Sequence, residues 1–132
     1  MGEKRHIPLA EATGTVEQVM MREPRVHDAD APIDVARAEL SNPKVKLLLV
    51  CDGPRLVGTV GREQVEGHAS AGPVSLGDLA VNGGPRLRPQ DSPARALELM
   101  SRLADHRVPV VDDEGQLVGL VCWNERHGCF CA

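Results

Sequence analysis

The amino-acid sequence contains an internal repeat, which restricts the possible folds more than any other feature. Shifting the chain by 61 residues aligns positions 24–60 with positions 85–121 without a gap, and ten of these positions are identical. A repeated unit of about 60 residues buries too little apolar surface to be stable alone, so the two copies are expected to share a core. The identical pairs are Pro24/Pro85, Arg25/Arg86, Asp30/Asp91, Pro32/Pro93, Val50/Val111, Asp52/Asp113, Leu56/Leu117, Val57/Val118, Gly58/Gly119 and Val60/Val121.

Each copy is predicted to begin with a short strand, at 25–27 or 86–88, and to continue into a helix. A proline two residues after Asp30 or Asp91 indicates the helix start, because the first turn has no partner for the N–H that proline lacks. Asp30 is the expected cap in the first copy, and Asp91 or Ser92 in the second. Apolar residues at helical spacing predict about three turns in the second copy and a weaker helix in the first. These residues are Ala94, Leu97, Met100, Leu103 and Ala104, and in the first copy Ile33, Ala36 and Leu40.

Two strands joined by a turn follow the helix, and a last helix completes a β-α-β-β-α pattern. The apolar run at 108–111 predicts a strand buried on both faces, and Asp-Glu-Gly then turns the chain into a return strand at 117–121. Gly58 and Gly119 lie in the return strands, where we expect other backbone to approach closely, so Gly119→Val should lower stability. Short helical segments are expected ahead of the two copies, at residues 16–21 and 76–80.

The repeated pattern resembles tandem CBS domains, which are named after cystathionine β-synthase and form the pair called a Bateman module. The resemblance depends mainly on P-Q-D-S-P-A-R-A-L-E-L-M at 89–100, H-R-V-P-V-V-D at 106–112 and G-Q-L-V-G-L-V at 115–121. The first copy matches more loosely, with K-V-K-L-L-L-V-C-D and R-L-V-G-T-V. The resemblance implies an α+β fold of two β-α-β-β-α CBS units, related by a pseudo-twofold axis and with their sheets packed together. The expected parts are an N-terminal tail at 1–14, unit one at 15–65, a linker at 66–74, unit two at 75–126 and a cysteine-rich C-terminal tail at 127–132.

The resemblance also implies a regulatory function. CBS pairs usually bind adenosyl compounds (AMP, ADP, ATP, S-adenosylmethionine or NAD) in clefts between the two units, and they bias an enzyme, channel or transporter. A stand-alone pair is expected to act in trans on a partner protein, whose identity the sequence does not supply. A symmetric homodimer is expected as well, since twofold dimers are the commonest oligomers. A ligand-free dimerisation adaptor is the alternative.

Site residues are carried over from the family by motif position. An apolar residue and a proline at the start of the second strand line the adenine pocket in the family, and Val108 and Pro109 match them. The family ending G-h-h-T-x-x-D supplies a hydroxyl and a ribose-binding carboxylate; the second copy has Cys122 and Glu125 there, and the first has Gly61 and Gln64. Because Glu125 keeps a carboxylate, the second copy is the expected nucleotide site, with Arg107 or Arg126 on a phosphate. The candidate nucleotide-binding residues are Ser75, Arg107, Val108, Pro109, Cys122, Glu125 and Arg126.

The C-terminal stretch C-W-N-E-R-H-G-C-F-C-A suggests a different function. Cys122, His127, Cys129 and Cys131 are potential metal ligands within ten residues, so a metal- or thiol-responsive switch is a further alternative. The simpler interpretation is that Cys122 is a small buried apolar residue and that the rest is a frayed, reduced tail. Cys129 and Cys131 are poor disulfide partners for each other, because a single residue separates them.

Composition argues against several other functions. The net charge is −4 with scattered basic residues and 2% aromatics, which disfavours binding to nucleic acid. The N-terminal residues show no secretory signal and no apolar run has the length of a membrane span, so we expect a cytoplasmic protein with reduced cysteines and no membrane contact. The motifs of serine hydrolases, zinc proteases and phosphate-binding loops are missing from the sequence, so no enzyme activity is expected.

Overall fold

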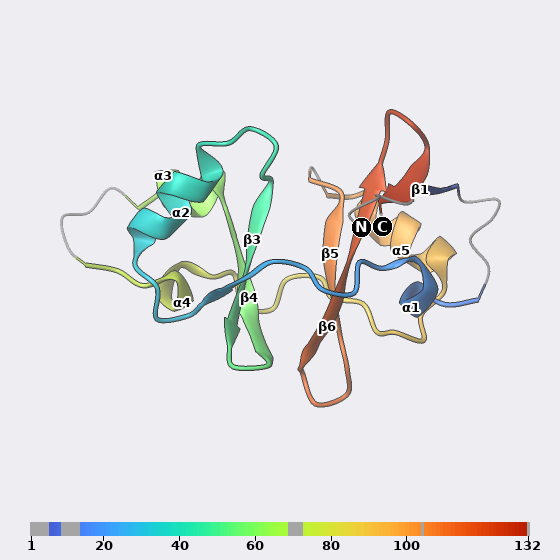
Figure 1. Ribbon diagram of the computed structural model, residues 1–132, viewed down its shortest axis with the longest axis horizontal. Coiled ribbons are helices and arrows are strands. Elements are labelled where there is room, and N and C mark those ends of the chain that lie inside the picture. Colours follow the sequence, from blue (N-terminus) through green and yellow to red (C-terminus); the bar gives the residue numbers. More distant parts are fainter. Residues whose placement is uncertain (1–5, 9–13, 69–72, 104, 132) are drawn as a thin grey trace. The chain divides into compact units, whose positions relative to one another are not determined.

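The computed structural model describes residues 6–8, 14–68, 73–103 and 105–131. The chain forms two compact units, Arg25–Gly84 and Met1–Pro24 together with Pro85–Ala132 (Figure 1). Each unit contains a β-sheet and short helices, which confirms the expected α+β class. Ala104, which was expected in a helix, lies outside the described residues.

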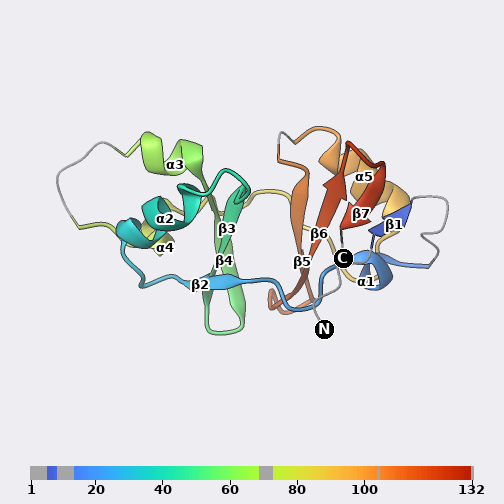
Figure 2. The ribbon, with the colours of Figure 1, turned by 45° about the horizontal axis from the view of Figure 1, so that its top comes forward.

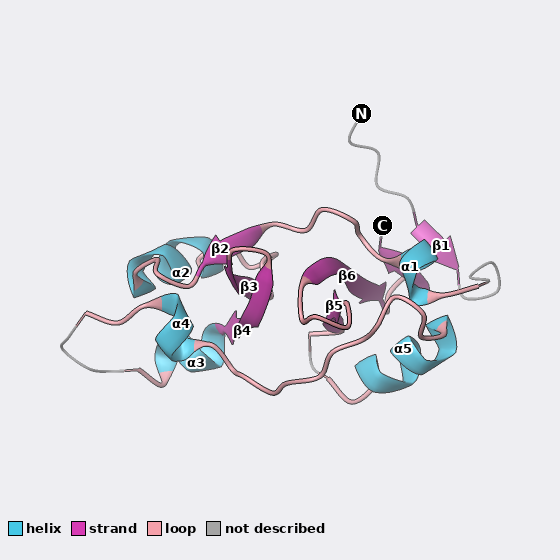
Figure 3. Cartoon of the chain, turned by 90° about the horizontal axis from the view of Figure 1, so that it is seen from below, coloured by secondary structure: helices cyan, strands magenta, loops and turns pink. Residues whose placement is uncertain are grey.

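The unit Arg25–Gly84 is a three-stranded sheet with its helices on one side (Figures 1 and 3). The sheet order is β2-β3-β4, in which β2 is parallel to β3 and β4 is antiparallel to it. The apolar side chains of α2, α4 and the two central strands form its core, namely Ala36, Leu40, Leu48, Val50, Val60 and Leu76. Its elements are β2 (Val26–Asp28), α2 (Ile33–Leu40), β3 (Leu47–Asp52), β4 (Arg55–Gly61), α3 (Arg62–Glu66) and α4 (Leu76–Leu79).

The other unit has a four-stranded sheet in the order β1-β7-β6-β5, and Figure 2 shows β7 lying between β1 and β6. Residues 108–111 are all buried, as the continuous apolar run predicted. Phe130 is fully buried in the same core as Val108, Val121 and Met100. The elements are β1 (His6–Pro8), α1 (Val16–Val19), α5 (Pro93–Met100), β5 (Arg107–Val111), β6 (Leu117–Asn124) and β7 (Cys129–Cys131).

The helix that precedes each copy belongs to the unit of the other copy. Val16 N donates to Asp91 O at 2.7 Å, and Met21 exchanges two backbone hydrogen bonds with Leu120 of β6. In the same way, Leu76 N donates to Ala31 O at 2.8 Å and Val81 N donates to Thr59 O at 2.8 Å. The compact units therefore differ from the expected sequential division at 15–65 and 75–126, because hydrogen bonds between distant segments decide where α1 and α4 pack.

The two copies are equivalent at an offset of 60 before the hairpin turn and 61 after it. The buried helix residues Ile33, Ala36 and Leu40 correspond to Pro93, Ala96 and Met100. The bulges between residues 50 and 51 and between residues 110 and 111 show the same offset of 60. Gly58 and Gly119 retain the offset of 61, so the ungapped alignment is wrong before the turn.

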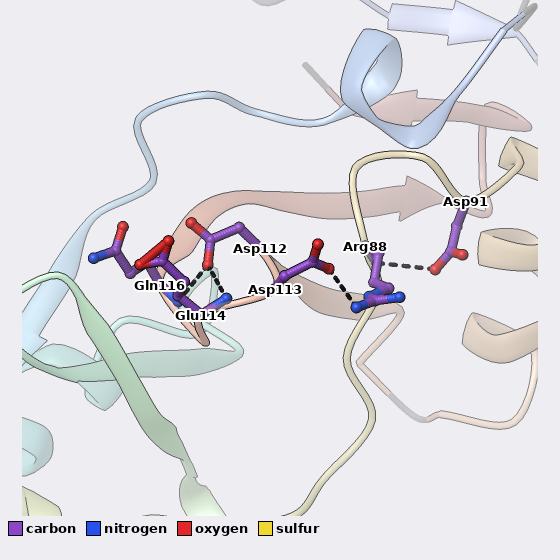
Figure 4. Close-up of polar contacts among 6 residues, drawn as sticks. All are labelled: Arg88, Asp91, Asp112, Asp113, Glu114 and Gln116. Carbon is purple, nitrogen blue, oxygen red and sulfur yellow. Dashed lines mark hydrogen bonds and ion pairs between the residues drawn. The ribbon is translucent and has the colours of Figure 1, made fainter.

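The turn between β5 and β6 accommodates the extra residue (Figure 4). The Asp112 carboxylate accepts hydrogen bonds from the N–H groups of Glu114 and Gln116, both at 2.9 Å. Gly115 takes a φ of 80°, which glycine adopts at little cost, and the exposed side chains of Arg88 and Asp113 form an ion pair. The Asp112 carboxylate thus orders the turn itself, whereas the Asp113 carboxylate pairs with Arg88 outside the turn.

The helix starts differ from the expectation in one copy. Ser92 caps α5, because its hydroxyl accepts a hydrogen bond from Arg95 N at 3.1 Å. The cap position of α2 is Pro32, which has no side-chain hydrogen bond, so Asp30 is not a cap. Asp91 instead accepts a hydrogen bond from Arg88 N.

The second-copy helix and first strand are shorter than predicted. Helix α5 has eight residues and ends at Met100, and Ala94 is exposed while Pro93 and Ala96 are buried. The expected strand at 86–88 is a single parallel bridge between Leu87 and Val110. The three-residue strand of the first copy lies at Val26–Asp28, one residue later than expected.

Both return-strand glycines lie where another part of the chain approaches closely, as predicted. A Cβ at Gly119 would lie 2.4 Å from Met20 Sδ and 2.8 Å from Met21 O. A Cβ at Gly58 would lie 2.4 Å from Val81 O. The segments that follow α1 and α4 thus contact β6 and β4 at positions that have room only for glycine.

Candidate functional site

The candidate residues Arg107, Val108 and Pro109 lie on β5, which pairs with β6. Arg107 lies opposite Cys122, and Pro109 lies opposite Leu120, so these four side chains share one face of the strand pair. Val108 lies opposite Val121, and both are fully buried in the core of their unit. Of the two residues expected to line an adenine pocket, Val108 is therefore part of the hydrophobic core. Pro109 lies on the same face of the strand pair as Arg107 and Cys122.

Arg107 is the cation of this face and is only partly buried. Its guanidinium Nη1 donates a hydrogen bond of 2.8 Å to Asp105 O. The residue between them, His106, has a φ of 53°, an uncommon value for a residue other than glycine. The chain therefore enters β5 through a constrained turn that also orients Arg107.

The second copy does not end in a helix, which corrects the predicted β-α-β-β-α pattern for that copy. Strand β6 continues to Asn124, and the chain turns over residues 125–128 into β7. Glu125 and Arg126 are exposed in this turn, which Gly128 closes by donating its N–H to Asn124 O at 2.8 Å. The carboxylate and the guanidinium thus lie beyond the end of β6 and not on the strand face of Arg107 and Cys122.

Two aromatic side chains explain why a strand replaces the helix. Trp123 of β6 lies directly opposite Phe130 of β7, and their rings meet edge to face with centroids 4.9 Å apart. Phe130 is fully buried, so the predicted frayed tail is wrong. The signal in the sequence was the N-E-R-H-G turn between two aromatic residues, which is typical of a hairpin with a glycine in its loop.

The first copy uses its corresponding residues for local structure. Gln64 Oε1 accepts a hydrogen bond of 2.6 Å from Gly61 N, at the start of α3. Gln64 therefore caps a helix at the position that Glu125 occupies in the second copy.

Ser75 belongs to the other compact unit and is the N-cap of α4. Its hydroxyl accepts a hydrogen bond from Asp78 N at 3.2 Å, and the Asp78 carboxylate accepts one from Ser75 N at 3.3 Å. This reciprocal capping box is a sufficient structural reason for a serine at this position.

The four cysteines are thiols in the structure. In the part of the chain that is described, no three His, Cys, Asp or Glu side chains are grouped so that they could hold a metal ion. The geometry therefore gives no support to a metal site built from Cys122, His127, Cys129 and Cys131. Among the described residues, no helix is both long enough and apolar enough to cross a bilayer.

Comparisons with known proteins agree with this architecture. Residues 84–124 match the family model of the CBS domain. The structure resembles CBSX2, a CBS-pair protein from Arabidopsis thaliana, in a complex with AMP and in a second crystal structure. The complex with AMP has a TM-score of 0.70 and 26% sequence identity, over 82% of this chain and 89% of that chain. The second structure has a TM-score of 0.69 and 25% identity, over 83% and 89%.

A curated relative extends the comparison to an enzyme. Inosine-5'-monophosphate dehydrogenase of Korarchaeum cryptofilum (strain OPF8) is 27% identical over 115 residues, which are 87% of this chain. The match covers only 24% of the length of that enzyme. Residues 84–124 are thus a CBS domain, and the chain as a whole has the fold of the CBS-pair proteins.

Proposed function

We propose that this CBS pair is a regulatory, non-catalytic module that binds an adenosyl nucleotide and acts in trans on a partner protein in the cytoplasm. The observation that carries the proposal is the match at 26% identity to CBSX2, which was solved in complex with AMP. The second copy supplies suitable chemistry, because Arg107 offers a cation on the same face as Pro109. The exposed Glu125 and Arg126 add a carboxylate and a second cation in the following turn.

Calorimetric titration of the full chain with AMP tests this proposal. Glu125→Ala is expected to weaken AMP binding at least about tenfold, since a hydrogen bond to a charged group contributes roughly 1.5 kcal/mol or more. Gln64→Ala is the matched control at the corresponding position and should leave the affinity nearly unchanged. ADP, ATP, S-adenosylmethionine and NAD, titrated in parallel, identify the preferred ligand.

Each outcome of the titration has a clear meaning. A larger loss in Gln64→Ala than in Glu125→Ala would assign the nucleotide to the first copy. The absence of binding heat and of any rise in melting temperature with all five compounds would reject nucleotide sensing, because a ligand that binds only the folded state must stabilise it.

A ligand-free dimerisation adaptor is the second candidate. It is favoured by Gln64, whose side chain caps α3, and by Val108, which is fully buried in the core. Under this proposal the chain is a homodimer whose melting temperature does not respond to nucleotides. Sedimentation equilibrium at micromolar concentration should then give twice the mass of the chain, and a monomer would reject the adaptor.

A further inference from the structure

The strand pair β6–β7 places three of the four cysteines on one face. Cys122 of β6 lies directly opposite Cys131 of β7, and Asn124 lies opposite Cys129. Side chains two residues apart on a strand share a face, so Cys129 and Cys131 lie on the same side as Cys122. This arrangement could not be recognised from the sequence, because it depends on the existence and the register of β7.

The register selects one pair among these three thiols. Directly opposite residues have Cβ atoms about 4.5–5.5 Å apart, whereas diagonal neighbours such as Cys122 and Cys129 have Cα atoms about 7–8 Å apart. Trp123 N donates to the O atom of His106, the residue before β5, so the N–H and C=O groups of Cys122 point the other way, toward β7. Cys122 and Cys131 are therefore a hydrogen-bonded antiparallel pair, with an expected Cα separation of about 5.5 Å.

That separation is suitable for a disulfide. Disulfide-linked residues have Cα atoms about 4.4–6.8 Å apart and Cβ atoms about 3.5–4.5 Å apart. Because Cβ atoms lie toward the wider end of the range of about 4.5–5.5 Å in hydrogen-bonded pairs, an approach of about 1–2 Å between the two Cβ atoms is needed to join Cys122 and Cys131. Cys131 is the last residue of β7 and pairs with His6 of β1 on its other side, so the shift involves the ends of these two short strands.

The two thiols also differ in their exposure to solvent, which determines which of them reacts first. Cys131 is partly exposed, whereas Cys122 is only 4% exposed. An oxidant in solution therefore meets Cys131 first, and Cys122 is positioned to react with the product.

We propose that Cys122 and Cys131 form a reversible dithiol–disulfide site that reacts with small-molecule disulfides such as oxidised glutathione. The Cys131 thiolate attacks the oxidant, forms a mixed disulfide and releases one glutathione thiolate. The Cys122 thiolate then attacks Cys131 Sγ and releases the second glutathione thiolate. The two protons lost by the cysteines are taken up by the two leaving thiolates, and two electrons pass from the cysteines to the oxidant.

The product would close a covalent loop from residue 122 to residue 131 and fasten β7 to β6. Cys122 also lies opposite Arg107, so the bond would stiffen the strand end next to that residue. This inference goes beyond the proposed function, because it requires no nucleotide and no partner.

Peptide mapping of the full chain tests the pair directly. The reduced protein is incubated with oxidised glutathione, denatured in the presence of N-ethylmaleimide so that every remaining thiol is blocked, and digested with trypsin. Cleavage after Arg126 separates Cys122, in the peptide 108–126, from Cys129 and Cys131 in the peptide 127–132. The expected product is these two peptides joined by one disulfide, with the number of blocked thiols falling from four to two.

Three cysteine positions provide the controls. Cys129→Ser should retain the linked peptides, and Cys131→Ser should lose them and show no intramolecular disulfide. Fragmentation of the wild-type linked peptides identifies the linked cysteine, so the result does not depend on the folding of either variant. Cys51 should stay blocked and unlinked, since burial raises the pKa of its thiol and leaves little thiolate to react.

Thermal unfolding provides a second measurement. The oxidised chain should melt at least about 3 °C above the reduced chain, and dithiothreitol should reverse the shift. The proposal fails if all four thiols remain after oxidation, if the linkage uses Cys129, or if only intermolecular disulfides form.

Discussion

The return strands of the two copies correspond up to Gly61 and Cys122, and they diverge at the next residue. Arg62 begins a helix in the first copy, while Trp123 continues a strand in the second. The guanidinium of Arg62 donates hydrogen bonds to Val45 O and Leu40 O, both at 2.7 Å, and to Asn42 O at 2.9 Å. The Trp123 ring packs on Phe130 instead. The same repeat therefore ends in a helix where this position is Arg62 and in a longer strand where it is Trp123.

The divergence affects the candidate site in both copies. In the first copy the chain turns away into α3, and Gln64 is used as its cap. In the second copy the hairpin adds β7 to the sheet and carries Glu125 into an exposed turn. A repeat can therefore keep its core and still lose the structural equivalence of its two candidate binding positions.

The largest expected effect concerns a feature that the copies share. Gly58→Val and Gly119→Val should each lower the free energy of unfolding by about 3 kcal/mol, because the added atoms overlap packed backbone. The loss should be greater for Gly58, whose nearest neighbours are main-chain atoms of Val81, than for Gly119, whose nearest neighbour is the flexible side chain of Met20. Urea unfolding followed by circular dichroism measures both.

Gly84→Val is the matched control for these two substitutions. A Cβ at Gly84 meets nothing closer than 3.8 Å, so the free energy of unfolding should change by less than about 0.5 kcal/mol. A neutral result for Gly119→Val would mean that the segment after α1 does not pack against β6.

The next effect concerns the point of divergence. Arg62→Ala should cost about 2 kcal/mol, because it removes charged hydrogen bonds to three carbonyl groups. Trp123→Ala should cost a similar amount through lost contact with Phe130. Hydrogen exchange separates the two variants: the first should expose amides of residues 41–46, and the second those of β7.

Arg62→Lys sharpens this test. A lysine keeps the charge but lacks the planar guanidinium that donates hydrogen bonds to the three carbonyl groups. Arg62→Lys should therefore recover less than half of the free energy of unfolding that Arg62→Ala loses. Full recovery by lysine would mean that charge alone holds the loop between α2 and β3.

The smallest effect concerns the helix starts. Ser92→Ala should lower the free energy of unfolding by about 1 kcal/mol, since its hydroxyl is the cap of α5. Asp30→Ala should change it little, because the N-cap of α2 is Pro32 and no side chain caps this helix. An equal loss in both variants would show that Asp30 contributes to α2 in some other way.

Much of the fold could be predicted because it depends on local patterns. The helix at Ile33–Leu40, the buried run at Val108–Val111 and the positions of Gly58 and Gly119 followed from spacing and composition. The ungapped alignment failed before the turn because a single offset of 61 was applied to the whole repeat. One additional residue in the turn before Leu117 was enough to shift every earlier equivalence.

The site was harder to predict than the fold. Motif position correctly indicated that Arg107, Pro109 and Cys122 lie on adjoining strands. It could not indicate that Glu125 lies in a hairpin turn, because the family pattern implies a helix there. The contact between Trp123 and Phe130 that stabilises this hairpin is a pairing across strands, and such pairing depends on tertiary context more than on propensity.

The sequence by itself determined the duplication, the alternation of strand, helix and hairpin, and the two glycines that need space at their Cα atoms. These features follow from side-chain periodicity and from backbone sterics, which act over a few residues. Only the tertiary structure decided that α1 and α4 join the units of the opposite copies, and that β7 completes the sheet beside β6. Those choices depend on hydrogen bonds such as Val16 N to Asp91 O, whose partners lie 75 residues apart in the chain. The pairing of Cys122 with Cys131 has the same origin, since a strand register exists only once both strands are in place.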